Sequence, residues 1–472
     1  MDAIDETELT EKNGASARHE SLIRRFDVLE LKWPEIIRFS ALFSLALVVL
    51  AGRIDIGRVL PLEGAIGELE WSVVFLAVAL VLTSWLWRTD RARFPTEPGS
   101  WLVLGGFAML MATVLAADLI ADRQPALGYL FDLARMALLL FLLAMLLESR
   151  RDIVFFSAVC LMIGASVGLL EYILWNYNRI YLITQISLSR ILVFSMACGM
   201  FMFLYKGSKL ALFSVFAIST FLLSGSLKVS LLSISALVFV LVLAMVAKRE
   251  FAALTAVLIA LGAGWTVSLM TGDFQNIANR VAVVSSGGQN AAFALPPPPV
   301  SESADSEQDV TARGLCVDVH APDLCINPHV VVPDTTERLR MWIYGFRLLN
   351  TSPWLGVGAN GYDLDLVYYY RQPVLFNYSY PHNVLLGTAV SHGVPHLAAF
   401  GIVLLSALAL LLTAVGRTTA TVAFLAGAGG IFIASMTGGD LYDARYIFVF
   451  AIMAGALFAI EVKGQSEPDL RN

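Results

Sequence analysis

Long apolar segments recur along most of this chain and limit the folds that are open to it. Runs of about 18–22 mainly apolar residues follow one another, and each can cross the roughly 30 Å of a bilayer's hydrocarbon core. The chain is 57% hydrophobic and only 15% charged, which leaves too little polar surface for a soluble protein of 472 residues. We therefore predict an all-α polytopic membrane protein with about twelve transmembrane helices.

The predicted spans lie on both sides of one long hydrophilic segment. The twelve ranges are 36–52, 72–88, 100–118, 129–147, 153–174, 188–205, 210–224, 229–247, 251–270, 394–414, 419–437 and 445–462. The predicted organisation is a tail (1–35), nine spans (36–270), a loop (271–382), three spans (383–462) and a second tail (463–472).

The short loops differ in charge between the two sides of the membrane. One side is basic, with Arg88, Arg91, Arg93, Arg150, Arg151, Lys206, Lys209, Lys248, Arg249 and Arg417. The other leans acidic, with Glu63, Glu68, Glu70, Asp118, Asp122, Asp440 and Asp443. The positive-inside rule then predicts cytoplasmic N- and C-termini and an extracytoplasmic loop 271–382.

The long loop contains two cysteines and a stretch of low complexity. Residues 285–310 are rich in Ser, Gly and Pro and are expected to be disordered. Cys316 and Cys325 follow, and an oxidising compartment favours a disulfide between them. A Cys/His metal site with His320 and His329 is the alternative, although the spacing matches no standard zinc pattern.

After the cysteines the loop regains local order. Asp334 and Glu337 have the spacing of a capping box, and helix formers continue to about Asn350. The stretch from Trp354 to Gly361 is a glycine-rich turn, and an aromatic-rich segment runs on to Tyr380. Such rings suit an interfacial belt or stacking on sugars.

His382 lies where the hydrophilic loop ends and an apolar segment begins. An imidazole titrates near neutral pH, so at this boundary it could take a proton from an attacking hydroxyl. From position alone, a structural role for His382, as a helix N-cap or an interfacial histidine, is favoured over the functional one.

Three cations depart from the charge pattern of the loops. Arg179, Arg190 and Lys228 lie at the outer ends of predicted spans, where topology gives no reason for them. Three cations from different hairpins at one membrane face can converge on a pyrophosphate. Snorkelling, or pairing with lipid phosphates, explains them as well.

Two further polar pairs fall inside predicted spans. Asp132 and Arg135 are three residues apart on one helix face and are expected to form an intrahelical ion pair. His392 and His396 are four apart, a spacing that could bind a metal, but no nearby carboxylate or cysteine completes a site. Helix packing or a place along a substrate channel is the preferred interpretation of these histidines.

The sequence lacks a common motif for nucleotide substrates. There is no Walker A motif for ATP. A transferase of this kind would need an activated donor, which outside the cytoplasm means a lipid diphosphate.

Together these features resemble the O-antigen ligase and O-antigen polymerase superfamily, which are integral-membrane glycosyltransferases of the GT-C type. The matching positions are Arg338, Trp342, Pro353 to Gly358, His382-Asn383 and Gly393. The family's Ser-x-Ser-Arg hairpin resembles Ser224 to Leu227, with Leu227 in place of Arg and Lys228 one position later.

The resemblance implies an inverting, metal-independent transfer that uses no cofactor. The donor would be a glycan on undecaprenyl diphosphate, and the acceptor either the lipid A–core sugar of a ligase or a lipid-linked repeat of a polymerase. We lean to the ligase. A secondary transporter is the more remote alternative, and the partners expected are membrane lipids but no nucleic acid.

The resemblance also assigns roles to residues. His382 would be the base, Arg179, Arg190, Lys228 and Arg338 would bind the diphosphate, and Tyr380, Asn383 and Trp354 would contact the glycan or acceptor. The protein would lie in a bacterial inner membrane with its active site in the periplasm.

Overall fold

The computed structural model describes eight stretches of the chain. These are residues 33–50, 71–95, 98–178, 185–221, 227–268, 334–369, 373–438 and 441–466. The predicted disulfide between Cys316 and Cys325, the low-complexity segment 285–310 and Arg179 lie outside them.

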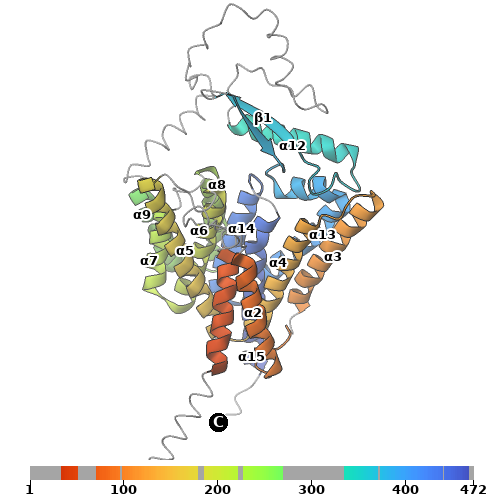
Figure 1. Ribbon diagram of the computed structural model, residues 1–472. Coiled ribbons are helices and arrows are strands. Elements are labelled where there is room, and N and C mark those ends of the chain that lie inside the picture. Colours follow the sequence, from red (N-terminus) through yellow and green to blue (C-terminus); the bar gives the residue numbers. More distant parts are fainter. Residues whose placement is uncertain are drawn as a thin grey trace, which may run out of the picture.

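The described chain is mainly helical, as predicted. A first helix, Trp33–Leu50, precedes the labelled elements of Figure 1. The helices are α2 (Trp71–Arg88), α3 (Pro98–Ile120), α4 (Leu127–Leu146), α5 (Arg150–Asn178), α6 (Gln185–Lys206), α7 (Lys209–Phe221), α8 (Leu227–Ala247), α9 (Phe251–Ser268), α12 (Asp334–Thr351), α13 (Val384–Arg417), α14 (Val422–Ser435) and α15 (Arg445–Ser466).

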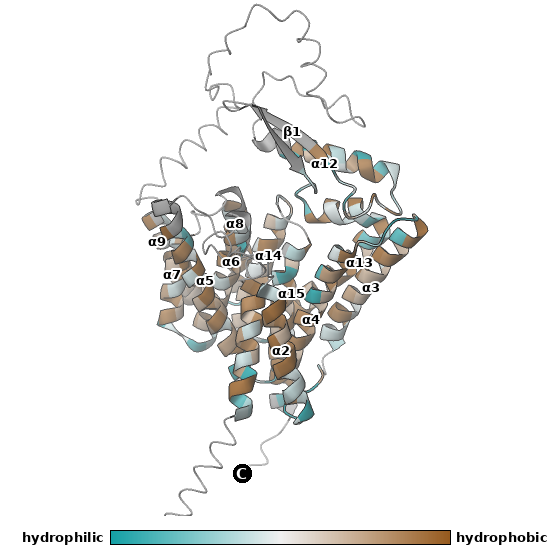
Figure 2. Cartoon of the chain, in the orientation of Figure 1, coloured by the Kyte–Doolittle hydropathy of each residue, from teal (hydrophilic) through white to brown (hydrophobic). Residues whose placement is uncertain are grey.

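Nine helices of the described part are long and apolar enough to cross a membrane. Apolar helices Lys209–Phe221, Phe251–Val267 and Thr419–Ser435 are shorter. Each predicted span thus coincides with an apolar helix, and hydrophobic residues predominate along the bundle in Figure 2. The membrane-spanning class is confirmed, and the count of twelve spans stays a prediction.

Several helices end in the same tight reversal, which sends the chain back along the bundle. Asp90, Asp122, Gly207 and Arg249 have φ between 51° and 65°, just beyond α2, α3, α6 and α8. After α2, the N–H of Arg91 donates to the carbonyl of Leu86 at 2.8 Å, the bond of a Schellman motif. After such reversals α3 packs against α4, α6 against α7 and α8 against α9.

One element was not predicted. Strands β1 (Leu364–Tyr369) and β2 (Pro373–Tyr378) form an antiparallel hairpin in which Leu364 pairs with Tyr378. The hairpin and α12 lie together beyond one end of the helix bundle (Figure 1). We call this part of the molecule the hairpin end.

A small second core fixes α12 to the hairpin and to α13. It contains Met341, Tyr344, Tyr362, Leu364, Leu386 and Val390. The hydroxyl of Tyr362 donates to the carbonyl of Met341 at 2.9 Å. The hydroxyl of Tyr344 donates to the backbone carbonyl of Asp363 at 3.0 Å. Burial, and secondarily the neighbouring Tyr344, raise the pKa of Tyr362 well above its usual range, so Tyr362 stays a neutral donor.

Candidate functional site

The first turns of α13 carry a kink that shapes the site. His392 and Gly393 depart from helical backbone angles, and Gly393 has a φ of 82°. Pro395 follows within the same helix and has no N–H to donate to the carbonyl of Ser391 four residues earlier. The helix ladder is therefore interrupted at this point.

The glycine-rich loop after α12 supplies the bonds that the kink removes. The N–H groups of Val357 and Gly358 donate to the carbonyls of Val390 (2.8 Å) and Ser391 (2.7 Å). In return, the N–H of Val394 donates to the carbonyl of Pro353 at 2.8 Å. The buried backbone groups at the kink are thus satisfied across two segments that are distant in sequence.

Two glycines are needed at this junction for reasons of space. Gly356 has a φ of 62°, and a Cβ there would come closer than 3.0 Å to the backbone of Ser391. A Cβ on Gly393 would come equally close to the backbone of Trp354. Real Cβ atoms do not approach backbone so closely. Glycine is therefore needed at both positions so that the backbones of the loop and of α13 can pack against each other.

A cation that the sequence analysis did not single out also holds the loop. Arg123, just beyond α3, donates from Nη2 to the carbonyl of Gly356 at 2.7 Å. Nearby, Asp118 accepts from the N–H of Ala126 at 3.0 Å and lies 3.7 Å from Nε2 of His392. The signal for Arg123 was weak, because one arginine in a short loop resembles any interfacial cation.

The two histidines of α13 are buried in the bundle. His396 lies 2.8 Å from Oγ1 of Thr113 and 3.0 Å from the hydroxyl of Tyr129. Its ring and that of His392 are 5.1 Å apart. In the described part of the chain, no group of three or more His, Cys, Asp or Glu side chains could hold a metal ion. The contacts agree with the packing interpretation of this pair.

His382 lies between the β-hairpin and α13, with a left-handed φ of 51°. Its ring centroid is 4.2 Å from that of Tyr380 and 5.7 Å from that of Tyr378. The N-cap of α13 is Asn383, whose side chain accepts from the N–H of Leu386 at 3.0 Å. The capping role that the sequence left open for His382 is therefore filled by its neighbour.

A cavity of about 190 Å³ opens between this turn and the helix bundle. It is lined by residues on both sides of His382, namely Ser379, Tyr380, Pro381 and Asn383. The bundle contributes Tyr129, Asp132, Leu133, Met136, Leu441 and Tyr442, and the glycine-rich loop contributes Gly358 and Ala359. The cavity thus joins the hairpin, the loop and the bundle.

Two buried arginines lie behind one wall of the cavity. The guanidinium carbons of Arg135 and Arg445 are 4.4 and 4.3 Å from the ring centroid of Tyr442. Arg135 also forms the predicted ion pair with Asp132, at 2.6 Å, and donates to the hydroxyl of Ser72 at 3.0 Å. Arg445 and Tyr442 were not predicted, because neither has a recognisable sequence signal.

Arg190 and Trp354, which were also predicted as site residues, are not part of the lining of this cavity. Arg190 is fully buried in α6, and its Nη2 donates to the carbonyl of Gly438, in the segment that leads to Leu441 and Tyr442. Trp354 is 67% exposed and does not line the cavity. Lys228 is in the first turn of α8, but its side chain lies outside the described part.

Arg338 is in the first half of α12. Its Nε and Nη1 atoms are buried, and within the described residues they have no hydrogen-bond partner. Two turns later on the same face, Gly345 adjoins Pro381 and Leu386. This face of α12 therefore points toward the turn that carries His382.

The chain was compared with known families and proteins. The family model described as O-antigen ligase matches residues 212–401, which include α12, the hairpin, His382 and the kink of α13. A comparison with curated protein sequences found no match. The match confirms the resemblance seen in the sequence: residues 212–401 of this chain are similar to the O-antigen ligase family.

Proposed function

We propose that the protein transfers a glycan from a lipid diphosphate to an acceptor hydroxyl, at the cavity beside His382. The observation that carries this proposal is that cavity, which lies at the end of a membrane-spanning bundle and is lined in part by matched residues, among them Tyr380 and Asn383. Membrane-spanning helices and a site at the bundle's end suit a substrate with an apolar anchor and a polar head.

In the proposed reaction His382 is the general base. The acceptor hydroxyl loses its proton to the imidazole, and its oxygen forms a bond to the anomeric carbon of the donor sugar. The bond from that carbon to the diphosphate oxygen breaks, and the lipid diphosphate leaves with the electron pair. Attack opposite the leaving group inverts the anomeric centre, without a metal or cofactor.

The leaving diphosphate needs positive charge that is already in place. We assign this role to Arg190 and Arg338, with Arg179 and Lys228 as further candidates from the sequence. The buried Nε and Nη1 of Arg338 support the assignment, since an arriving phosphate oxygen could accept from them. Buried cations that need no rearrangement stabilise developing charge most effectively.

The glycan and acceptor would bind on the hairpin side of the cavity. The ring of Tyr380 offers a face for stacking on a sugar, and Asn383 is adjacent to the base. Exposed Trp354 would contact the glycan farther from the reacting atoms.

The proposed orientation places the hairpin end in the periplasm and both termini in the cytoplasm of a bacterial inner membrane. The basic turn that carries Arg91 and Arg93 lies at the opposite end of the bundle, because it precedes α3, whereas Asp118 is in the last turn of α3 and Arg123 lies just beyond it. The positive-inside rule favours that arrangement.

Replacing His382 tests the base directly. His382→Asn is sharper than His382→Ala, because Asn tolerates a positive φ and keeps a polar side chain but cannot take a proton at neutral pH. We expect transfer of glycan by purified protein to fall by about 100-fold or more. The measurement is a transfer assay with lipid-diphosphate donor and purified acceptor.

The matched control is Arg249→Asn, at a φ of 59° in a tight turn after α8. It should leave transfer unchanged. If His382→Asn transferred glycan at the wild-type rate with normal protein levels, His382 would not be the base.

The acceptor decides between the two activities of the superfamily. We favour a ligase with a lipid A–core acceptor, and an O-antigen or exopolysaccharide polymerase is the alternative. Loss of a ligase leaves long chains on the lipid diphosphate, whereas loss of a polymerase leaves single repeats. Analysis of the lipid-linked pool in a deletion strain distinguishes these outcomes.

A further inference from the structure

A second, larger cavity lies at the end of the bundle opposite His382. Its volume is about 550 Å³, and it opens among the turn after α2, the C-terminal ends of α4 and α15 and the start of α3. Its charged lining residues are Arg38, Asp90, Arg91, Arg93, Glu148 and Lys463. The proposed glycan transfer does not use this cavity.

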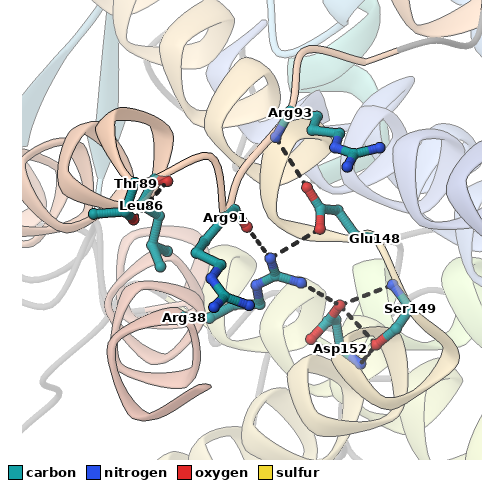
Figure 3. Close-up of polar contacts among 8 residues, drawn as sticks. All are labelled: Arg38, Leu86, Thr89, Arg91, Arg93, Glu148, Ser149 and Asp152. Atoms are coloured by element: carbon teal, nitrogen blue, oxygen red, sulfur yellow. Dashed lines mark hydrogen bonds and ion pairs between the residues drawn. The ribbon is translucent and has the colours of Figure 1, made fainter. Parts of the chain in front are cut away.

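The turn that carries Arg91 and Arg93 is held firmly in place. The carbonyl of Arg91 accepts from Arg38, and the N–H of Arg93 donates to Oε1 of Glu148 at 2.9 Å (Figure 3). Ala92 between them is 2% exposed, and Nε1 of Trp101 donates to the carbonyl of Pro95 at 2.8 Å. The backbone bonds of this turn leave both arginine side chains available.

Arg91 and Arg93 are exposed, and in Figure 3 the dashed lines reach only their backbone atoms. Within the described residues neither has an ion pair or side-chain hydrogen bond. The lining carboxylate of Glu148 is already engaged by Arg38 at 2.8 Å. The rim of the cavity therefore carries two arginines, next to the carboxylate of Asp90, on a backbone that is held in place, and this pair of cations suits a phosphate.

The rest of the lining is mainly apolar, and we call this part of the cavity the apolar slot. Its lining includes Ala144 and Leu147 of α4 and Ile452, Ala456, Ala459 and Ile460 of α15. From Lys463 back to Ile452, α15 covers about 16 Å at 1.5 Å per residue. Small alanine side chains leave room along this length for an extended hydrocarbon chain.

We propose that this cavity binds one anionic phospholipid, with its phosphate on Arg91 and Arg93 and an acyl chain along α15. A ligand of this kind has the two properties that the lining requires, a charged head at the rim and a long apolar part. The basic turns predict that this end faces the cytoplasm, where anionic lipids attract juxtamembrane cations. A free phosphate would match the rim but not the apolar slot.

The test is lipid retention by the purified full-length protein. The protein in a neutral detergent is titrated with phosphatidylglycerol or zwitterionic phosphatidylethanolamine, and native mass spectrometry counts the bound lipid. Wild type should retain one phosphatidylglycerol in preference to phosphatidylethanolamine. The double variant R91Q/R93Q should bind it about 30-fold more weakly, since each surface cation contributes about fivefold.

The matched control is R249Q/R417Q, which removes two exposed cations from other turns at the same predicted membrane face. It should retain phosphatidylglycerol as wild type does. Equal weakening in both double variants would mean only a general attraction to surface charge, and no weakening in R91Q/R93Q would also overturn the proposal.

Two more arms test the apolar slot and the source of the phosphate. A456F fills the slot beside intact arginines and should lower phosphatidylglycerol retention as well; retention at the wild-type level would remove the acyl chain from this slot. Soluble glycerol phosphate at millimolar concentration should not displace the lipid. Displacement would identify a phosphate site in place of a lipid site.

Discussion

The two ends of the helix bundle hold their cations in different ways. At the hairpin end, Arg190 and Arg445 are 0% and 1% exposed. The carbonyl of Gly438 accepts from Arg190, and the rings of Tyr442 and Tyr446 each lie 4.3 Å from the guanidinium carbon of Arg445. At the opposite end, the side chain of Arg38 is 18% exposed and that of Arg150 is 55% exposed, and both pair with carboxylates.

This difference has consequences for function. Burying a cation is costly, so the groups that contact Arg190 and Arg445 fix them in position at the expense of stability. Such fixed charge is what a departing diphosphate requires. At the opposite end carboxylates neutralise Arg38, and the charge left for a ligand belongs to the exposed turn with Arg91 and Arg93.

The strongest test of the comparison is Gly393→Ala at the kink of α13. A φ of 82° disfavours alanine, and the added Cβ would overlap the backbone of Trp354. Strain of this kind costs about 1–3 kcal/mol, and the overlap adds to it by separating the loop from α13. We expect a large fall in the temperature of unfolding in detergent, with loss of glycan transfer.

The control is Gly401→Ala in the same helix, where a Cβ would meet nothing within 4 Å. It should unfold at or slightly above the wild-type temperature, because alanine favours helix. If both variants behaved alike, the loop would not be joined to α13 as the contacts indicate.

The sequence predicts much of this arrangement. Each predicted span coincides with an apolar helix, because long hydrophobic runs report membrane helices directly. Helix α12 (Asp334–Thr351) begins at the residue expected from its capping pattern. The Asp132–Arg135 pair also forms, since three-residue spacing brings side chains together on any helix.

What the sequence could not predict depends on contacts between distant segments. The hairpin was hidden in a run of tyrosines that also suits a membrane interface. The start of α13 was placed ten residues late, at 394 in place of Val384, because the kink and Pro395 resemble a helix boundary. Tyr442 meets Arg135 across more than 300 residues, and no local pattern reports that contact.

A second test removes the ring between the two buried arginines. Tyr442→Leu deletes a face that lies within 4.4 Å of both guanidinium carbons. Because the arginines are buried, we expect a loss of about 2 kcal/mol, seen as a lower unfolding temperature in detergent. Tyr442→Phe keeps the ring and should retain most of the stability that Tyr442→Leu loses.

The matching variant at the opposite end of the bundle is Tyr205→Leu, which removes a ring beside an exposed cation. Tyr205 lies next to exposed Lys206, whose Nζ is 5.3 Å from the ring centroid. Its contribution as a partner for that cation should be below about 1 kcal/mol. An effect of Tyr442→Leu no larger than that of Tyr205→Leu would contradict the contrast between buried and exposed cations.

The smallest effect is expected from Arg38→Gln at the opposite end. The change removes the ion pairs with Glu148 at 2.8 Å and Asp152 at 3.5 Å, but Glu148 still accepts from the N–H of Arg93. Partly exposed pairs contribute little, so we expect a loss of about 1 kcal/mol that shrinks as salt is added. Thermal unfolding in detergent at low and high ionic strength measures both quantities, with exposed Arg417→Gln as the variant that should change neither. A loss as large as that of Tyr442→Leu, unaffected by salt, would mean that the cations of the two ends are held with similar strength, and the distinction drawn between them would fail.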